Sequence, residues 1–316
     1  MKNSFFTESV ANAIPSFDLL HNEMPVMFAY RTMEEIWEES EGEADEPHRH
    51  NFYTIIWVKE GTGLHNIDFV AHDIVPGRVF FLSPGQVHQV ISYSEPIGVV
   101  LMFTADFLCK HNLNHDFMRA LSLFEPGESS EPLDIPEGRE KMIELASKEI
   151  ISLFNNESTG CEDATGTAQC ERFRNEAVAS WLKIFLIECH KFLPADKNTN
   201  TQFTQTGKSL LADFKDLLEE NFGRWHQVSQ YSSALNITAD YLNNVVKESA
   251  GANAKEIIQK RIILEAKRLG VNTGLSSKEI AYSLGFKDPA HFSKFYKSVT
   301  GENFTDFRSS ADLYNR

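Results

Sequence analysis

The chain has 316 residues, of which 42% are hydrophobic and 11% aromatic, enough to build about two globular domains. Its formal net charge of −15 argues against non-specific binding to nucleic acids, and no run of about eighteen apolar residues predicts a membrane span. The N-terminal stretch lacks a signal-peptide pattern and the four cysteines form no C-x-x-C pair, so we expect a cytoplasmic protein with reduced thiols.

The negative charge is unevenly distributed along the chain. Residues 205–316 contain 15 Lys and Arg against 13 Asp and Glu, whereas residues 1–204 contain 15 against 32. A polyanion responds to the local field, so the average charge does not exclude a specific DNA-binding end.

Residues 26–104 have the pattern of short antiparallel strands. The runs NFYTIIWVKEG, RVFFLSPG and IGVVLMF are rich in β-branched and aromatic residues and are separated by Gly and Pro. Strands of this kind predict a β-barrel or sandwich. Eight acidic side chains lie between Glu34 and Glu46. We interpret this acidic segment, residues 34–46, as a solvated loop, with a contact surface for a protein partner as the alternative.

Two amphipathic helices are predicted after the strands. Residues 137–154 place an apolar stripe at Met142, Leu145, Ile150, Leu153 and Phe154. Residues 171–192 repeat apolar side chains every four positions, at Phe173, Ala177, Trp181, Phe185 and Cys189, and the stripe is widened by Leu182, Leu186 and Leu193. Such a helix covers a barrel or pairs with its own copy, so we expect a homodimer through helix 171–192.

Residues 194–207 are polar and aperiodic, which predicts a linker. The expected fold class is therefore α+β and multidomain. Residues 1–193 form an antiparallel β-barrel with helices, and residues 208–316 form an all-α domain.

Within the all-α domain one helical arrangement occurs twice. Val228–Gly251 and Ser277–Gly301 each read as a short helix, a tight turn (LNI or LGF) and a second helix that begins at a capping residue, Thr238 or Asp288. This is the helix-turn-helix plan, in which the second helix enters the DNA major groove. A helix of about sixteen residues, roughly 24 Å long, separates the two units. Adding the width of the packed helices at each end places the recognition helices on the order of ~34 Å apart, one turn of B-DNA.

The last 100 or so residues resemble the AraC/XylS family of transcription regulators. The resemblance rests on LEAKRLG…SKEIAYSLGFKDPAHFSKFYKSVTGENFTDFR, whose Ile-Ala, Gly-Phe, aromatic-Ser, Phe-aromatic-Lys and Gly landmarks occur in order. It implies two helix-turn-helix units joined by a long helix. Three positions depart from the family pattern: Phe304 replaces a usual proline, Ser232 a usual alanine, and Asp240 lies where basic or glutamine residues are common.

The second helices offer candidate contacts to double-stranded DNA. Asn243 or Asn244 suits adenine N6 and N7, and Lys294 or His291 suits guanine O6 and N7. Phosphate contacts are expected from Lys247, Lys297 and the helix N-termini. The complete candidate set is Thr238, Asp240, Tyr241, Asn243, Asn244, Lys247, Lys287, Asp288, His291, Lys294 and Lys297.

The N-terminal half resembles, less specifically, the cupin-type barrel that many AraC-like regulators use as a sensor. The segments PHRHNFYTIIWVKEGTG and PGRVFFLSPGQVHQV carry the resemblance. His48 and His50 match the His-x-His pair of metal-dependent cupin enzymes, and His88 matches their later histidine. The glutamate of those enzymes is missing, since Thr54 and Ile55 fill its window, and Ser92 replaces a common asparagine. Three imidazoles can still bind zinc or iron, but we expect ligand contact and assign neither metal nor cofactor.

The predicted function is a sequence-specific transcription regulator, not an enzyme. An effector of unknown identity is expected to bind in the barrel, and RNA polymerase is a candidate partner. The candidate effector-binding residues are His48, His50, Tyr53, Trp57, Phe81 and His88. Two alternatives stay open: a metal-binding cupin enzyme fused to a DNA-binding domain, and an effector-independent regulator controlled by a partner through the acidic segment.

Overall fold

The computed structural model describes residues 14–21, 24–113, 115–124, 131–155, 166–194, 205–250 and 252–314. The chain splits into two compact units: unit 1 contains Pro15–Lys197 and unit 2 contains Asn198–Arg316. No helix among these described residues is long and apolar enough to cross a membrane.

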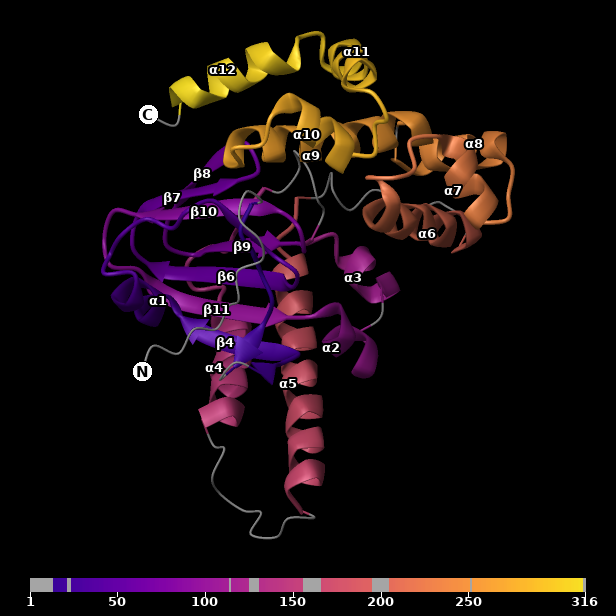
Figure 1. Ribbon diagram of the computed structural model, residues 1–316. Helices are drawn as coiled ribbons and strands as arrows, with labels where there is room; N and C mark the ends of the chain where they lie inside the picture. Colours follow the sequence, from indigo (N-terminus) through magenta and orange to yellow (C-terminus); the bar gives the residue numbers. More distant parts are fainter. Residues whose placement is uncertain are drawn as a thin grey trace. The chain divides into compact units, whose positions relative to one another are not determined.

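Unit 1 is built on two five-stranded sheets, because its short apolar runs are interrupted by glycine and proline turns (Figure 1). The first sheet has the order β1-β5-β10-β7-β8 and the second β12-β9-β6-β11-β4, and β2 and β3 form a separate pair. The strands are β1 Ser16–Phe17, β2 Leu20–His21, β3 Met24–Pro25, β4 Phe28–Thr32, β5 His48–His50, β6 Tyr53–Glu60, β7 Gly63–Ile67, β8 Val70–Ile74, β9 Arg78–Leu82, β10 Val87–Ser92, β11 Ile97–Phe103 and β12 Leu133–Asp134.

The second sheet is buried on both faces, so unit 1 has two apolar cores. One face carries Ile56, Val58, Phe80 and Val100 and packs with Ile67 and Ile74 of the first sheet. The other carries Ile55, Trp57, Phe81 and Leu101 and is covered by helices. These helices of unit 1 are α2 Ala105–Lys110, α3 His115–Leu121, α4 Lys141–Asn155 and α5 Gly166–His190, and α4 and α5 run side by side (Figure 1).

The acidic segment is not simply a loop, because its first residues form helix α1, Met33–Glu39. Thr32 caps this helix by accepting a hydrogen bond from the Glu35 N–H, and the Glu35 side chain accepts one from the Thr32 N–H. Met33 is buried, and Ile36 is half-buried three residues later. The capping box and this apolar spacing outweigh the repulsion between acidic neighbours.

The stripes predicted on the two long helices were partly wrong. On α4 the buried side chains include Ile143, Ala146 and Ile150, whereas Met142 and Leu145 are more than 40% exposed. On α5, Phe185 and Cys189 are buried as expected, but Phe173 is 63% exposed. The buried face of α5 follows Val178, Ala179, Leu182, Phe185, Leu186 and Cys189.

Unit 2 is entirely helical over its described residues. Its helices are α6 Gln205–Asn221, α7 Val228–Ala234, α8 Ala239–Ala250, α9 Ala254–Asn272, α10 Ser277–Ser283, α11 Pro289–Thr300 and α12 Phe304–Tyr314. Helix α6 therefore begins inside the predicted linker 194–207. Phe304, which replaces the usual proline, is buried against Phe292 and Tyr296 at ring distances of 5.1 and 5.0 Å. The aromatic ring thus fills the core between α11 and α12.

Candidate functional site

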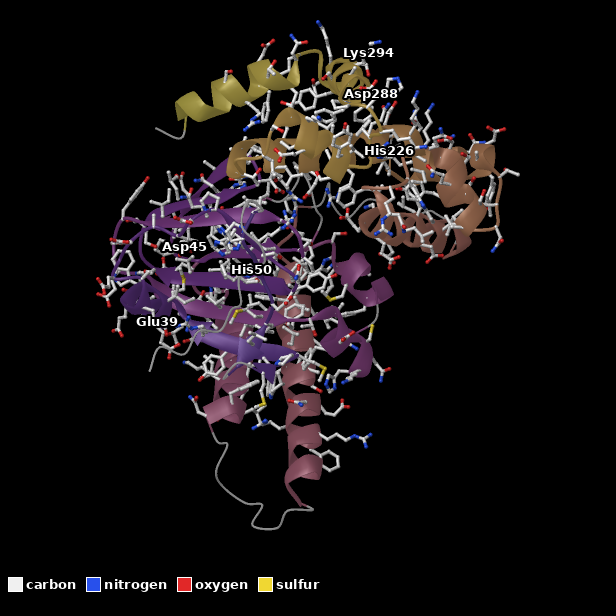
Figure 2. The ribbon with its side chains drawn as sticks, in the orientation of Figure 1. Glu39, Asp45, His50, His226, Asp288 and Lys294 are labelled. Carbon is white, nitrogen blue, oxygen red and sulfur yellow. The ribbon has the colours of Figure 1, made fainter. Side chains whose placement is uncertain are left out.

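A cavity of about 430 Å³ lies between the two sheets of unit 1, which together we call the barrel. Apolar side chains make up much of its wall, among them Met33, Ile36, Ile56, Val90, Val100 and Met102. Polar groups that face it include Arg31, Asp45, His48, His50, Thr54 and His88. Figure 2 labels Asp45 and His50 within the barrel. This mixture of an apolar wall and a few polar groups is typical of a small-molecule site.

Strand register decides which side chains reach the cavity. Along β6, Thr54 and Ile56 line it, so the alternate residues Tyr53 and Trp57 point to the opposite face of the sheet. Trp57 meets Phe185 of α5 at a ring distance of 6.3 Å, and Tyr53 stacks on Phe103 at 5.5 Å.

Phe81 belongs to that same helix-covered face, because it pairs with Ile55 and packs against Phe124 at 5.2 Å. The expectation that Tyr53, Trp57 and Phe81 line a pocket with the histidines was therefore wrong. A shift of one residue in register exchanges the two faces of a strand, and the register of β6 cannot be determined from the sequence alone.

The three predicted histidines do come together. His48 and His50 lie on β5 and His88 on β10, and one ring nitrogen from each lies within 4.8 Å of the others. The Nε2 atoms of His48 and His50 are 3.2 Å apart. The ring of His88 lies 4.3 Å from that of His48 and 4.9 Å from that of His50. The antiparallel pairing of His88 with His48 explains this convergence.

A fourth histidine, His65 on β7, supports the cluster and was missed by sequence reasoning. Its Nε2 lies 3.1 Å from Nδ1 of His88, and its side chain is fully buried. Alternation with the buried Gly63 and Ile67 in GLHNI indicates an inward position. The pairing of β7 with β10, which brings the two rings together, is not visible in the sequence.

Hydrogen bonds orient two of the rings. The Nδ1–H of His48 donates to the carbonyl oxygen of Glu46 at 2.8 Å, since a carbonyl can only accept. In the neutral ring this leaves a lone pair on His48 Nε2. His88 uses Nδ1 for His65. Its Nε2 is buried without a hydrogen-bond partner among the described residues, as is Thr54 Oγ1. The cavity therefore holds buried polar atoms that protein groups leave unsatisfied.

Burial shifts the pKa values in the cavity. It lowers the pKa of His50 and of His88 well below the ordinary histidine value, and neighbouring histidines add to this effect. The pKa of His65 falls to about 3, also chiefly through burial. Burial raises the pKa of Asp45, and the nearby His48 partly opposes that shift. At neutral pH His50, His65 and His88 are therefore uncharged, with nitrogen lone pairs available.

Unit 2 contains two helix-turn-helix arrangements, α7–α8 and α10–α11. Thr238 and Asp288 cap their second helices as the sequence predicted, accepting hydrogen bonds from the N–H groups of Tyr241 and Ala290. Each turn contains one left-handed residue, Asn236 with φ of 54° and Gly285 with φ of 78°. These conformations suit asparagine and glycine.

The candidate DNA contacts are exposed with one exception. Asn243 is half-buried and its Oδ1 is enclosed, so Asn244 is the more accessible amide of α8. The exposed members are Thr238, Asp240, Tyr241, Asn244, Lys247, Lys287, Asp288, His291, Lys294 and Lys297. Figure 2 labels Asp288 and Lys294, at the start and on the exposed side of α11.

Helix α9 connects the two arrangements and is part of the core of unit 2. It has 19 residues, so it is roughly 28 Å long. Glu265 and Arg268 are buried on it and interact at 3.4 Å, and Arg261 pairs with Glu219 of α6 at 2.8 Å. Arg261 thus links α9 to α6, and Arg268 forms an ion pair within α9, whereas the lysines of α8 and α11 are exposed.

Two family models match the chain, one in each unit. An AraC-like ligand binding domain matches residues 39–99, which include the histidine cluster and much of the cavity wall. A helix-turn-helix domain matches residues 231–310, which include α8 to α11.

Relatives match along most of the chain at low identity. The regulator YfiF of Bacillus subtilis, described as an uncharacterized HTH-type transcriptional regulator, is 22% identical over 83% of this chain and 78% of its own length. The HTH-type transcriptional activator RhaS of Mannheimia succiniciproducens is 22% identical over 89% of this chain and 93% of its own. Among solved structures, ToxT of Vibrio cholerae bound to (E)-4-(8-methylnaphthalen-1-yl)but-3-enoic acid is 14% identical and covers 90% of this chain and 100% of its own, with a TM-score of 0.38.

Proposed function

The chain belongs to the AraC-type transcription regulators, and from that premise we propose that α8 and α11 read a specific DNA sequence under the control of a small molecule bound in the barrel of unit 1. The observation that carries this proposal is the duplicated helix-turn-helix arrangement, whose second helices present exposed amide and ammonium groups. Such groups recognise base edges and phosphates.

Roles follow from exposure and chemistry. Asn244 on α8 and Lys294 and His291 on α11 contact base edges. Lys247, Lys287 and Lys297 contact phosphates, together with the capped helix starts at Thr238 and Asp288. Asp240 and Tyr241 lie at the start of α8 and limit which bases fit beside it, because a carboxylate accepts hydrogen bonds and repels phosphate.

The effector occupies the 430 Å³ cavity and contacts His48, His50 and His88. The apolar wall contributes buried area, and the unsatisfied Thr54 Oγ1 and His88 Nε2 offer polar contacts to a ligand. An effector controls DNA binding only if it binds one arrangement of the protein more tightly than another. We propose a regulatory role because the matched relatives are transcription regulators, and because Thr54 and Ile55 fill the window in which metal-dependent cupin enzymes carry a glutamate.

We further propose a cytoplasmic homodimer that acts on RNA polymerase, with residues 1–193 for effector binding and dimerisation, 194–207 as the linker and 208–316 for DNA binding. Exposed apolar side chains on α5, Phe173 and Ile187, support pairing through helix 171–192.

Selection of duplexes from a random DNA pool by the full chain tests the proposal. We expect one enriched sequence with two half-sites about one helical turn apart. The double variant Lys294→Ala/Lys297→Ala should lose most of the affinity, whereas Lys148→Ala, which removes an exposed lysine of α4, should retain it. A pool without enrichment, or equal affinity in the double variant, would overturn the proposal.

A further inference from the structure

We propose that His48, His50 and His88 form a binding site for one divalent transition-metal ion in the wall of the barrel cavity. The site shares its cavity with the proposed effector, but it depends on no property of unit 2. The proposal rests on how the nitrogen atoms converge, on which lone pairs are available and on where the open side of the cluster faces.

The separations of the nitrogens suit a shared ion. Ligands at 2.0–2.1 Å from a metal with angles between 90° and tetrahedral lie roughly 2.9–3.4 Å apart. The two Nε2 atoms of His48 and His50 are 3.2 Å apart, inside that range. All three nitrogens lie within 4.8 Å of one another, so the widest separation must shorten by at most roughly 1.5 Å for all three to bind one ion.

The hydrogen bonds turn one ring nitrogen of His48 and one of His88 toward a shared ion. His50 Nε2–H donates to His48 Nε2 at 3.2 Å, and a bound ion would replace that proton. His48 donates its Nδ1 proton to Glu46, which leaves Nε2 as its lone-pair nitrogen. His88 contacts His65 through Nδ1, which leaves Nε2, buried and without a hydrogen-bond partner among the described residues. Metal-binding histidines commonly use the second nitrogen in this way, because its hydrogen bond fixes the ring orientation. Glu46 and His65 are the orienting groups here.

The donor set indicates the class of metal. Three imidazoles favour Zn²⁺, Ni²⁺, Cu²⁺, Co²⁺ or Fe²⁺, whereas Ca²⁺ and Mg²⁺ prefer oxygen ligands. The cluster faces the cavity, so an ion held by three protein nitrogens keeps coordination positions open toward it. Oxygen or nitrogen donors of a bound molecule can occupy those positions.

The test uses the full chain without an affinity tag, stripped of metal and titrated with Co²⁺ while its visible absorption is recorded. We expect one Co²⁺ per chain, with the intense d–d bands of a four- or five-coordinate ion, displaced by Zn²⁺. His48→Gln and His88→Gln should each weaken binding by more than about 100-fold. His72→Gln is the matched control, because His72 lies on β8 of the same sheet and contributes nothing to the cluster.

Absence of Co²⁺ binding by the wild-type chain, or unchanged binding in both cluster variants, would overturn the proposal. If a variant unfolds, X-ray absorption of the wild-type Zn²⁺ complex decides: three imidazole ligands support the site, and an oxygen-only or thiolate shell overturns it. Both measurements are made without DNA. Failure of the regulator function would appear in the DNA selection and not here, so the two proposals fail separately.

Discussion

The Nε2 atom of His65 lies 3.1 Å from Nδ1 of His88, and both imidazoles are buried. One of these nitrogens donates and the other accepts, so each ring fixes the tautomer of the other. The ring of His65 also packs on Phe80 at 4.6 Å. This pair therefore links the histidine cluster to the apolar core between the sheets.

Replacing His65 with alanine should destabilise unit 1. The change leaves His88 Nδ1 buried without its partner and opens a cavity beside Phe80, so we expect the free energy of unfolding to fall by about 2–4 kcal/mol. Urea unfolding followed by fluorescence measures it. His72→Ala, on the residue paired with His65 across the sheet, is the control and should cost less than about 1 kcal/mol. Equal losses in the two variants would contradict the role given to His65.

Gly285→Ala should destabilise unit 2. Gly285 has a left-handed φ of 78°, and a Cβ there would overlap the carbonyl oxygen of Gly223. We expect a loss of at least about 2 kcal/mol in the free energy of unfolding, read from the shift of the urea midpoint. The corresponding residue of the first turn provides the comparison, since Asn236→Gly relieves strain and should change stability by less than about 0.5 kcal/mol. A stable Gly285→Ala protein would argue against this turn geometry.

Two neighbouring positions on α8 should separate base reading from phosphate binding. Asn244→Ala is expected to cost about 1–3 kcal/mol on the selected duplex and to relax the preference at one base pair. Lys247→Ala should instead weaken binding to all duplexes alike and reduce the slope of log affinity against log salt by about 1. Binding titrations at several salt concentrations, on matched and mismatched duplexes, measure both. Identical behaviour of the two variants would refute the assignment.

His226 should make the stability of unit 2 depend on pH. Its Nε2–H donates to the carbonyl of Leu284 at 2.8 Å, and its ring packs on Phe286 at 4.5 Å. Burial lowers the pKa of His226 below 6.5, and the hydrogen bond to Leu284 partly opposes this shift.

The unfolded chain binds a proton at His226 near pH 6.5, before the folded chain does. The free energy of unfolding should therefore fall as the pH drops below about 6.5 and level off below the folded-state pKa. Urea titrations between pH 5 and about 8 should show a shallower dependence for His226→Gln than for the wild type. Parallel curves would show that His226 does not contribute.

The sequence predicted the elements whose signals are local. The β-branched runs became strands, and Thr238 and Asp288 cap their helices because a short polar side chain can satisfy N–H groups within one turn. His48 and His50 share a face because side chains alternate along β5.

What the sequence did not predict depends on contacts between distant segments. The pairing of Ile55 with Phe81 sets which face of β6 lines the cavity. Trp57 therefore lies on the helix-covered face, against Phe185, and not in the expected pocket. His65 joins the cluster only through the pairing of β7 with β10. Helix α1 forms because its capping box and the burial of Met33 override its acidic composition. Tertiary context decided each of these outcomes.

The wall that separates the cavity from the helices is a single sheet. Ile56 lines the cavity and Trp57, the next residue, packs against Phe185 of α5, so adjacent residues of β6 contact the cavity and the long helix. Interiors packed to crystal density transmit displacement instead of absorbing it. Strand β6 therefore contacts the cavity with one face and helix α5 with the other.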